Sequence, residues 1–428
     1  MRWTEGRGRV ALGRMAVSVC LAAAACAPPR VDPGPPPPLL SPGLPTSEPE
    51  VKIGLAVDAD TLEIGVTGGY RIVEASSGRT LSRGAGANEW LARVSSDAAV
   101  TLGGEAASRG GLVVEPAGDA LVTVAENSYR GSVLLQSRSA GRLTAVNLVA
   151  LETYLLGVVP REIGQVGEEL FETAKAQAVA ARTYAIAHLG RRSALGFDLY
   201  ATVADQAYGG ASVEHGTVSR AVFATGGEIL VYDGEPIEAY YHSTCAGRTA
   251  AIEEVWDADP EPYLKSVIDV NPRTGESYDR SSRLFEWTVR WTASELEQIL
   301  SRTLADSLPP GTGSVGEIHD LRVAGLTPSG RVARLVIETE NGTFVSGRDR
   351  VRWILERPEG GLLYSSKFEV EVSRGPDGRV TEVVADGGGW GHGIGMCQVG
   401  AMGRDRAGQG YREILAAYYR DARVRELY

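Results

Sequence analysis

Two histidine–cysteine pairs have the side chains in this sequence that are best suited to bind a metal. His242 and Cys245 form an H-x-x-C pair, and His392 with Cys397 forms a second pair far along the sequence. Two thiolates and two imidazoles could hold a tetrahedral zinc ion. Two other interpretations stay open: a disulfide between Cys245 and Cys397, or two histidines that bind substrate beside inert thiols. Because the five histidines are scattered along the chain, we expect no metal site and no cofactor.

A series of short motifs runs from residue 147 to the C-terminal region. They are NLVALETYLLGVVPREI (147–163), AKAQAVAARTYA (174–185), DQAYGG (205–210), AYYHSTCAGRTA (239–250), VW (255–256), PYLKSV (262–267), GGGWGHGIGMCQVGAMG (387–403) and REILAAYY (412–419). In this order they resemble the SpoIID/LytB family, which comprises the stage II sporulation protein D group and the LytB amidase enhancers. Several motifs in order are far more specific than one. The resemblance covers the chain from about residue 51 to its end.

The resemblance implies a catalytic acid at Glu162, which follows the YLLGVV stretch. It also implies lytic cleavage of peptidoglycan glycan strands. A lytic transglycosylase protonates the leaving glycosidic oxygen and later removes a proton from the 6-hydroxyl of the same sugar, which attacks in place of water. One carboxyl group can perform both steps, so the second carboxylate of ordinary retaining glycosidases is dispensable.

Two other interpretations compete at this position. Without the motif, Glu162 would be interpreted as an exposed glutamate at a helix end, paired with Arg161. Glu152 is the nearest rival acid, but its spacing from Leu151 and Leu155 suits a buried structural contact or a helix N-terminal carboxylate.

Polar and aromatic residues of the same motifs are the candidates for substrate binding. Arg182 could orient Glu162 through a charge-assisted hydrogen bond, although an architectural role is an equal alternative. Polar and aromatic groups in turns often bind sugars. The predicted substrate-binding residues are Lys175, Arg182, Asp205, Gln206, Tyr208, Tyr240, His242 and His392.

The strands and helices that we expect around these residues indicate an α+β fold. Residues 51–148 contain short alternating stretches such as Val51–Val57, separated by turn residues, and predict a β-rich N-terminal lobe. Helical spacing begins at Leu151 and continues to Pro160. A second helix is predicted from Glu168 to Leu189, and its alanine-rich face indicates a central, buried position.

Residues 149–428 form the predicted SpoIID-type catalytic region, which includes a mixed α/β C-terminal lobe. A hairpin is expected at Ile229–Tyr241 with its turn at Asp233-Gly234. Further strands are predicted at Trp287–Trp291, Ala333–Glu338 and Phe368–Val372, and further helices at Val218–Thr225, Ala293–Leu304 and Tyr411–Tyr419. We expect the lobes to close a long cleft to which the central helices present Glu162.

The N-terminal region predicts export. Basic residues precede the apolar run Met15–Ala25, which ends in small residues before Cys26. This is the pattern of a signal peptide at residues 1–26, and the Cys26 position resembles a lipidation site, although Ala23 stands where leucine is usual. A plain signal peptide cut near Ala25 or Ala27 is the alternative. Residues 27–50 are Pro-rich and predict an extended linker. We therefore expect a protein of the cell envelope, anchored by lipid to the outer face of the cytoplasmic membrane or in the periplasm.

The composition limits the kinds of molecule that the protein is expected to bind. The chain has 428 residues, 43% hydrophobic residues and a net charge of −11. No Lys/Arg-rich run with interleaved aromatic residues is present, which argues against nucleic acid. The expected partner is peptidoglycan glycan. The alternative function is a non-catalytic wall-binding enhancer of an N-acetylmuramoyl-L-alanine amidase, because the resemblance includes both activities.

The predicted lipid anchor can be tested on the exported protein. We expect intact-mass analysis to find a mature chain that begins at Cys26 and carries the added mass of acyl groups, since the new N-terminal cysteine is the site of lipidation. A mature chain with an unmodified N-terminus would contradict the anchor.

Overall fold

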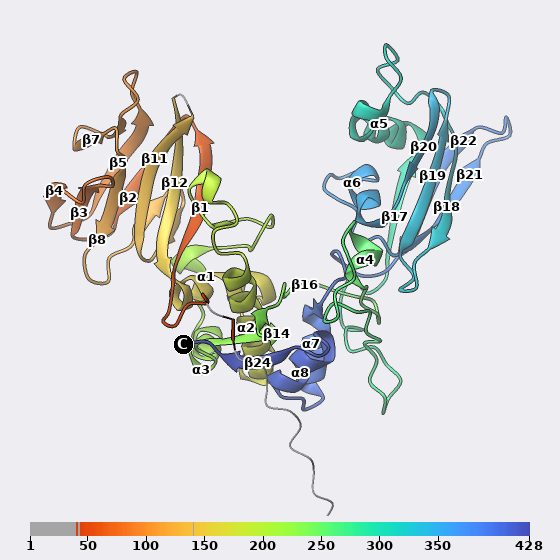
Figure 1. Ribbon diagram of the computed structural model, residues 1–428. Coiled ribbons are helices and arrows are strands. Elements are labelled where there is room, and N and C mark those ends of the chain that lie inside the picture. Colours follow the sequence, from red (N-terminus) through yellow and green to blue (C-terminus); the bar gives the residue numbers. More distant parts are fainter. Residues whose placement is uncertain (1–39, 42, 140) are drawn as a thin grey trace, which may run out of the picture. The chain divides into compact units, whose positions relative to one another are not determined.

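The computed structural model describes residues 40–41, 43–139 and 141–428 (Figure 1). The predicted signal peptide, Cys26 and the linker up to residue 39 lie outside the described residues. The fold is α+β, as the sequence predicted. Among the described helices, none combines the length and the apolarity that a bilayer crossing requires.

The N-terminal strands form two sheets that share one core. The seven-stranded sheet has the order β13-β1-β12-β11-β8-β3-β4, and the six-stranded sheet has the order β10-β9-β2-β5-β6-β7. The strands are β1 (Glu50–Ala59), β2 (Thr61–Val66), β3 (Tyr70–Glu74), β4 (Thr80–Gly84), β5 (Asn88–Val94), β6 (Val100–Leu102), β7 (Ala106–Ser108), β8 (Leu112–Pro116), β9 (Val122–Val124), β10 (Asn127–Tyr129), β11 (Ser132–Ser139), β12 (Arg142–Ala150) and β13 (Leu199–Tyr200). The predicted β-rich segment is therefore confirmed at the level of its strands.

Alternation along these strands explains their burial. In β5, Trp90 and Ala92 are buried, whereas Glu89, Leu91 and Arg93 are more exposed. Successive side chains of a strand point to opposite faces, so the buried set forms one face of the sheet. The same core cluster contains residues of both sheets and of the first helices, including Ile53, Ile64 and Leu155.

The central helices follow directly from β12. They are α1 (Leu151–Ile163), α2 (Phe171–Ala187) and α3 (Gly216–Ala224). The prediction that the first helix ends at Pro160 is wrong, because α1 continues to Ile163 and carries Glu162 in its last turn. Pro160 removes one backbone donor from the helix. Burial of Val158, Val159 and Ile163 along this turn offsets that loss.

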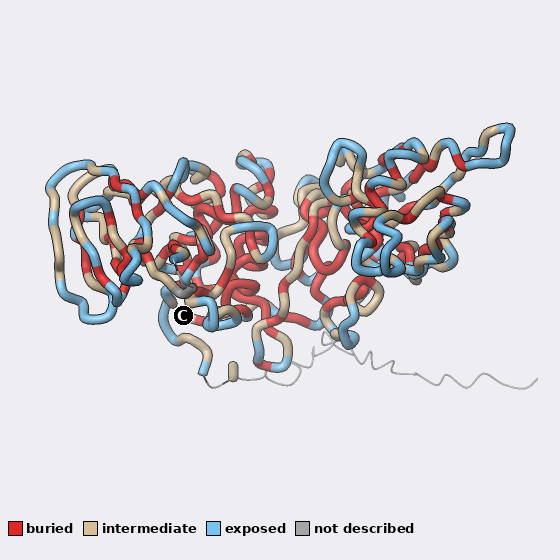
Figure 2. The backbone as a smooth tube through the Cα atoms, turned by 90° about the horizontal axis from the view of Figure 1, so that it is seen from above, coloured by how far each residue is buried: buried red, intermediate tan, exposed pale blue. Residues whose placement is uncertain are grey.

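Helix α2 is buried on nearly every side (Figure 2). Ala174, Ala178, Ala181 and Ala185 are fully buried, as predicted. Their small side chains allow neighbouring backbones to approach closely, and α2 contacts α1, α3, α7 (Gln398–Arg406), α8 (Tyr411–Tyr418) and β14 (Glu228–Tyr232). This helix is therefore the central packing element of the described chain.

Most of the predicted later elements are confirmed, and they form short sheets. The predicted elements are β14 (Glu228–Tyr232) with β15 (Glu235–Pro236), β17 (Trp287–Thr292), α5 (Ala293–Thr303), β19 (Val332–Thr339), β21 (Phe368–Arg374) and α8 (Tyr411–Tyr418). The sequence did not predict α4 (Ile252–Val255), β18 (Ile318–Leu326), β20 (Gly342–Ser346), α6 (Val351–Ile354), β22 (Val380–Gly387) and β24 (Arg423–Glu426). Strands β17, β22 and β21 form one sheet, and β18, β19 and β20 form another. These two sheets share a second core cluster.

The predicted hairpin turn has the expected geometry. Asp233 and Gly234 have φ values of 50° and 86° between β14 and β15. Positive φ at both central residues is the requirement of the tight hairpin turn that Asp-Gly favours. The hairpin is shorter than predicted, because Tyr241 leaves it to join another strand.

Three further elements, around His242 and Cys397, were also not predicted from the sequence. Strand β16 (Tyr241–His242) pairs in parallel with β23 (Met396–Cys397), and α7 (Gln398–Arg406) begins immediately after β23. Helix α7 was not predicted because its segment contains glycines, and glycine is a poor helix former. Gly403 is required there by packing: a Cβ atom at this position would lie 2.0 Å from the backbone oxygen of Tyr278.

A buried ion pair joins α1 to α2. The Arg182 guanidinium donates two hydrogen bonds of 2.7 Å to the Glu152 carboxylate, and the two side chains are 0% and 12% exposed. Burial alone raises the pKa of Glu152, but the Arg182 hydrogen bonds and charge, with a hydrogen bond from Tyr428, outweigh it, so the pKa is lowered. Glu152 is thus the buried structural contact that its spacing suggested.

Removing one partner of this pair should destabilise the fold strongly. Glu152→Ala leaves Arg182 buried without its carboxylate, and we expect a loss of about 3–5 kcal/mol in the free energy of unfolding, measured by urea denaturation. Glu382→Ala is the matched control, because its ion pair with Arg290 has side chains that are 41% and 62% exposed. The control should change stability by less than about 0.5 kcal/mol. Equal losses in the two variants would contradict the structural role.

Candidate active site

Three separate segments converge on the Glu162 carboxyl group. The backbone N–H of Ala207 donates to Oε1 at 3.0 Å, and Nε2 of Gln398 donates to Oε2 at 3.5 Å. The Tyr241 hydroxyl also hydrogen-bonds to this carboxyl group. The end of α1, the loop at 205–210, strand β16 and the start of α7 therefore meet at one acid.

A glycine of α1 allows the loop at 205–210 to approach. A Cβ atom on Gly157 would lie 2.6 Å from a ring carbon of Tyr208 and 2.8 Å from the oxygen of Gly210. The N–H of Gly209 donates to the Gly157 oxygen at 3.0 Å. Any larger residue at 157 would displace the loop, and with it the Ala207 N–H that binds Glu162.

The loop side chains predicted to bind substrate have internal partners instead. The Asp205 carboxylate is 0% exposed and accepts two hydrogen bonds from Arg192, at 2.7 and 2.9 Å. Tyr208 is 7% exposed and donates to Asn147 at 2.9 Å. We therefore correct the substrate-binding prediction for these two residues, because buried, bonded groups support the loop and do not face a ligand.

Gln206 acts on the acid through Tyr241. Its Nε2 donates to the Tyr241 hydroxyl at 3.0 Å and to the Ala181 oxygen at 3.2 Å, while its Oε1 accepts from Tyr154 at 3.3 Å. The Tyr241 hydroxyl oxygen accepts a hydrogen bond from Gln206. The hydroxyl proton of Tyr241 is therefore free to be donated to the Glu162 carboxyl group. Gln206 is 1% exposed, so it is corrected from a substrate-binding residue to a positioning residue.

The structure also corrects the roles of Arg182 and Lys175. Arg182 is bound to Glu152 and to backbone oxygens of residues 222 and 228, so it does not orient Glu162. Lys175 pairs with Glu172, and its Nζ lies 4.8 Å from the ring centroid of Tyr411. These partners attach Lys175 to the start of α8 and not to the residues around Glu162.

His392 holds the backbone of the site as a neutral ring. Its Nε2 donates to the Tyr241 oxygen at 2.9 Å, and its Nδ1 accepts from the Ile394 N–H at 3.1 Å. Burial lowers the pKa of His392 to about 4. With both nitrogens engaged, His392 positions Tyr241 and has no free nitrogen for a substrate, which corrects its predicted role.

Tyr240 belongs to an aromatic cluster beside the site. Its ring lies 4.8 Å from that of Trp256, and the Trp256 ring lies 5.2 Å from His392. The Tyr240 hydroxyl donates to Glu238. Tyr240 and Trp256 are half-buried, so parts of their rings stay accessible to a sugar.

The electrostatics of the site favour a protonated acid. Burial raises the pKa of Glu162, and the hydrogen bonds from Ala207, Gln398 and Tyr241 lower it without cancelling the effect of burial. A glutamic acid that keeps its proton to higher pH is suited to general acid catalysis.

Two partners of Glu162 were missed from the sequence. Tyr241 and Gln398 lie inside the quoted motifs, each directly beside a residue that the sequence singled out, His242 and Cys397. Gln398 also donates to Oε1 of Gln177 on α2 at 3.4 Å, which fixes its amide. Tyr241 and Gln398 both reach Glu162 because β16 pairs with β23. The two strands are far apart in the sequence, so their pairing could not be predicted from it.

The two histidine–cysteine pairs are only partly brought together. Cys245 and Cys397 are buried free cysteines. His242 is 4% exposed and lies beside them, whereas His392 uses both nitrogens elsewhere. Burial and hydrogen bonding also leave His242 without access to a substrate, contrary to its predicted role.

A pocket of the described chain lies away from Glu162. It has a volume of about 750 Å³, and Glu162 is not among its lining residues, which include Phe285, Trp287, Lys367 and Asp386. The predicted cleft over Glu162 therefore remains a prediction.

The fold and site define an α+β protein with a half-buried glutamic acid at the junction of several motifs. Residues 139–232 match the family described as stage II sporulation protein (SpoIID), and residues 250–395 match a domain of unknown function, DUF8618. Stage II sporulation protein D of Bacillus subtilis is 31% identical over 297 residues, which are 66% of this chain and 76% of that protein. The chain therefore belongs to the stage II sporulation protein D family.

Two further relatives match at similar identity. An uncharacterized protein of Brachyspira hyodysenteriae is 31% identical over 278 residues, which cover 65% of this chain and 67% of that protein. The amidase enhancer of Bacillus subtilis is 30% identical over 296 residues, which are 62% of this chain but 39% of that protein. This chain thus matches well under half of the amidase enhancer.

The raised pKa of Glu162 and its dependence on Tyr241 can be measured directly. We expect ¹³C-carboxyl NMR, with Glu162→Gln identifying the resonance, to give a pKa above the ordinary glutamate value of about 4.3. Tyr241→Phe removes a donor to the carboxylate and should raise the pKa further. Tyr232→Phe, on another strand, should leave the pKa unchanged. A wild-type pKa at or below the ordinary value would refute the effect of burial.

Proposed function

We propose that this protein is a peptidoglycan lytic transglycosylase in which Glu162 is the acid and base. The observation that carries the proposal is the convergence of three segments on the Glu162 carboxyl group, whose pKa burial raises. Membership of the stage II sporulation protein D family supports it, as does the family match over residues 139–232, which include Glu162.

The proposed reaction uses Glu162 twice. The protonated acid first donates its proton to the glycosidic oxygen of the leaving sugar as the bond from that oxygen to the anomeric carbon breaks. The 6-hydroxyl of the remaining muramic acid then forms a bond to the same carbon, and its proton returns to the Glu162 carboxylate. The product is a 1,6-anhydro ring, no water is consumed, and the acid is regenerated.

The partners of Glu162 fit both protonation states. The Ala207 N–H, the Gln398 amide and the Tyr241 hydroxyl can each donate to the carboxylate that exists between the two steps. None of these three described partners is a carboxylate.

The aromatic cluster and the N-terminus complete the proposal. The half-buried rings of Tyr240 and Trp256 are suited to pack against a sugar face. We place the activity at the cell envelope, held there by the predicted N-terminal lipid at Cys26.

A second candidate function is enhancement of a cell-wall amidase without catalysis. The 30% identity to the amidase enhancer of Bacillus subtilis favours it. In that case the surface around Glu162 would bind glycan, and the acid itself would be dispensable.

Substitution of the acid separates the two functions. Glu162→Gln keeps the size and much of the hydrogen bonding of the side chain but cannot give and recover a proton. We expect strand cleavage to fall by about 10²–10⁴-fold while glycan binding and thermal unfolding stay near wild type. Mass spectrometry of purified strands should show 1,6-anhydro-muramic acid ends from the wild type.

The matched control is Glu169→Gln, an exposed glutamate in the turn that precedes α2. It should cleave like the wild type. Equal cleavage by Glu162→Gln and wild type would remove Glu162 as the acid, and reducing ends in place of anhydro ends would indicate hydrolysis. No cleavage by wild type of either intact or peptide-stripped strands, with stimulation of an added amidase, would support the enhancer function.

A further inference from the structure

The pocket of about 750 Å³ lies at one end of the sheet formed by β17, β22 and β21. Its volume is within the range of about 300–1,000 Å³ that is usual for sites that bind small molecules. All of its lining residues except Ala246 fall within residues 250–395, the part of the chain that matches a domain of unknown function. The chemistry proposed for Glu162 does not use this pocket.

A row of polar side chains crosses the sheet at the pocket. Thr288 of β17 is directly opposite Asp386 of β22, and Asp386 is directly opposite Glu369 of β21. Directly opposed residues project from the same face of a sheet. All three residues are exposed and line the pocket. The pocket therefore lies over the solvent face of the sheet.

Two carboxylates stand side by side in this row. Asp386 and Glu369 are like charges at directly opposed positions, an arrangement that destabilises a sheet. The Thr288 hydroxyl donates to Asp386, but within the described chain neither carboxylate has a lysine or arginine partner. Natural folds depart from such a rule mainly at functional sites. This end of the pocket is therefore suited to bind a cation.

Lys367 places a positive charge on the same face. The Gly388 N–H donates to the Lys367 oxygen at 3.0 Å, which extends the strand pairing by one residue. Residues two apart in a strand share a face and lie about 6.5 Å apart, so Lys367 is the neighbour of Glu369. The Lys367 ammonium nevertheless pairs with no carboxylate of the described residues. Its Nζ donates to the Ala246 oxygen at 2.7 Å, and two of its three N–H donors remain for a ligand.

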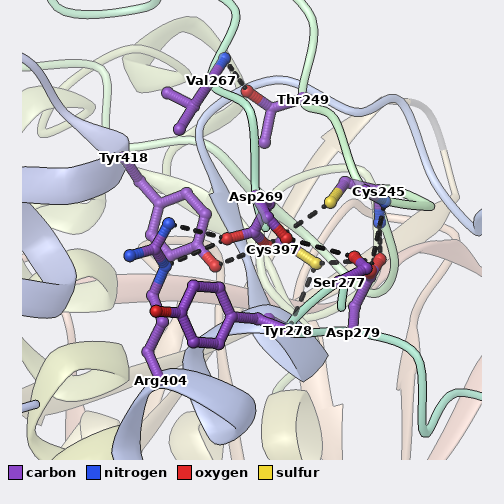
Figure 3. A network of polar contacts seen from close by, with 12 residues as sticks. Cys245, Thr249, Val267, Asp269, Ser277, Tyr278, Asp279, Cys397, Arg404 and Tyr418 are labelled. Atoms are coloured by element: carbon purple, nitrogen blue, oxygen red, sulfur yellow. Dashed lines mark hydrogen bonds and ion pairs between the residues drawn. The ribbon is translucent and has the colours of Figure 1, made fainter. Parts of the chain in front are cut away.

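The backbone that holds this lysine is itself fixed. The N–H groups of Cys245, Ala246 and Gly247 donate to the Asp279 carboxylate at 2.8, 2.7 and 3.1 Å (Figure 3). These bonds use the Asp279 carboxylate and set the direction of the Ala246 oxygen. The Lys367 ammonium is thus held at the edge of the pocket by a rigid segment.

A second cation lies behind the first. Arg331 follows the pocket residue Gly330 and is 1% exposed, and in the described chain its three guanidinium nitrogens have no hydrogen-bond partner. Burial lowers the pKa of Lys367, and the charge of Arg331 lowers it further, while Cys245 and Asp279 oppose this effect without cancelling it. Buried cations without partners favour an anion beside them. This end of the pocket is therefore suited to bind a carboxylate.

The space between the two ends is open and partly apolar. Gly388 has no side chain, and a Cβ atom there would lie 2.9 Å from the Ala246 Cβ and 2.7 Å from the Phe285 oxygen. Leu326 is 54% exposed and Phe285 is half-buried, and both line the pocket. A short hydrocarbon chain could pack against these two side chains.

We propose that this pocket binds an α-amino acid group that carries both its ammonium and its carboxylate. The carboxylate binds to Lys367, and the ammonium binds between Asp386 and Glu369. One carbon atom separates the two charged groups of such a ligand, which matches opposite charges on neighbouring positions of one sheet face.

The source of this group is the stem peptide of peptidoglycan. Within a peptide, backbone amide bonds consume the amino and carboxyl groups of each residue. A diamino dicarboxylic acid residue, such as meso-diaminopimelic acid, keeps a second α-amino acid group at the end of its side chain, and its hydrocarbon chain suits Leu326 and Phe285. This choice of source rests on the proposed function, whereas the charge pattern of the pocket does not.

The test is isothermal titration calorimetry of the full chain with the synthetic peptide L-Ala-γ-D-Glu-meso-diaminopimelic acid. We expect saturable binding of one peptide per chain. Amidation of the distal carboxyl group, or acetylation of the distal amine, should each weaken binding by about 10-fold or more, because each change removes one charged partner. Free D-alanine carries the same charged group without the peptide and should bind more weakly. Equal affinity for D-alanine would overturn the stem peptide as the source.

Substitutions in the pocket identify the site. Lys367→Met, Asp386→Asn and Glu369→Gln should each weaken peptide binding by about 10-fold or more, and Lys367→Met should no longer distinguish the amidated peptide from the free acid. Glu371→Gln is the matched control, because Glu371 is an exposed glutamate on the same face of β21 that does not line the pocket. The control should bind like the wild type. Thermal unfolding of each variant checks the fold, and the modified peptides test the same contacts on the wild type.

The outcomes separate this proposal from the proposed function. The proposal is overturned if the wild type does not bind the peptide, or if the three pocket variants bind it like the wild type. Strand cleavage is measured independently of binding. A protein that binds the peptide and cleaves no strands keeps this site and loses the transglycosylase function, and a protein that cleaves strands without binding the peptide does the reverse.

Discussion

The parallel pairing of β16 with β23 is the interaction on which the functional part of this protein depends. It joins Tyr241–His242 to Met396–Cys397, and the period of two along a strand sends neighbouring residues to opposite faces. On one face, Tyr241 reaches Glu162, while Gln398 enters the same site from the first turn of α7. On the other face, His242 and Cys397 meet Cys245. A two-residue ladder therefore sets the geometry of two separate polar sites.

Close packing of small residues supplies the rest of the site. Alanines along α2 and the glycine at 157 allow helices and a loop to approach at backbone distance. The close packing brings the backbone N–H of Ala207 within hydrogen-bond distance of the Glu162 carboxyl group. Asp205, Gln206 and Tyr208 of the same loop are held by internal hydrogen bonds.

The sequence predicted local features well and tertiary ones poorly. Alternation in β5, the Asp-Gly turn at 233–234 and the alanine-rich helix could be predicted, because each follows from short-range patterns. The end of α1 could not, since packing around Pro160 overrides its local preference. The partner of Arg182 and the roles of Asp205, Gln206 and Tyr208 depend on which residues meet in the fold, and spacing along the chain does not contain that information. The role of Glu162 as the acid comes from its motif and stays a prediction.

Strand β24 has a consequence for the time at which the protein becomes complete. It lies at the C-terminal end of the chain, pairs with β14 through contacts such as Leu230 with Val424, and is followed by Tyr428, whose hydroxyl donates to Glu152 at 2.7 Å. Contacts between residues so distant in sequence form late in folding, because loop closure must precede them. The start of α1, where Glu152 lies, therefore gains its partner Tyr428 only after residues 423–428 have been synthesised and β24 has paired with β14.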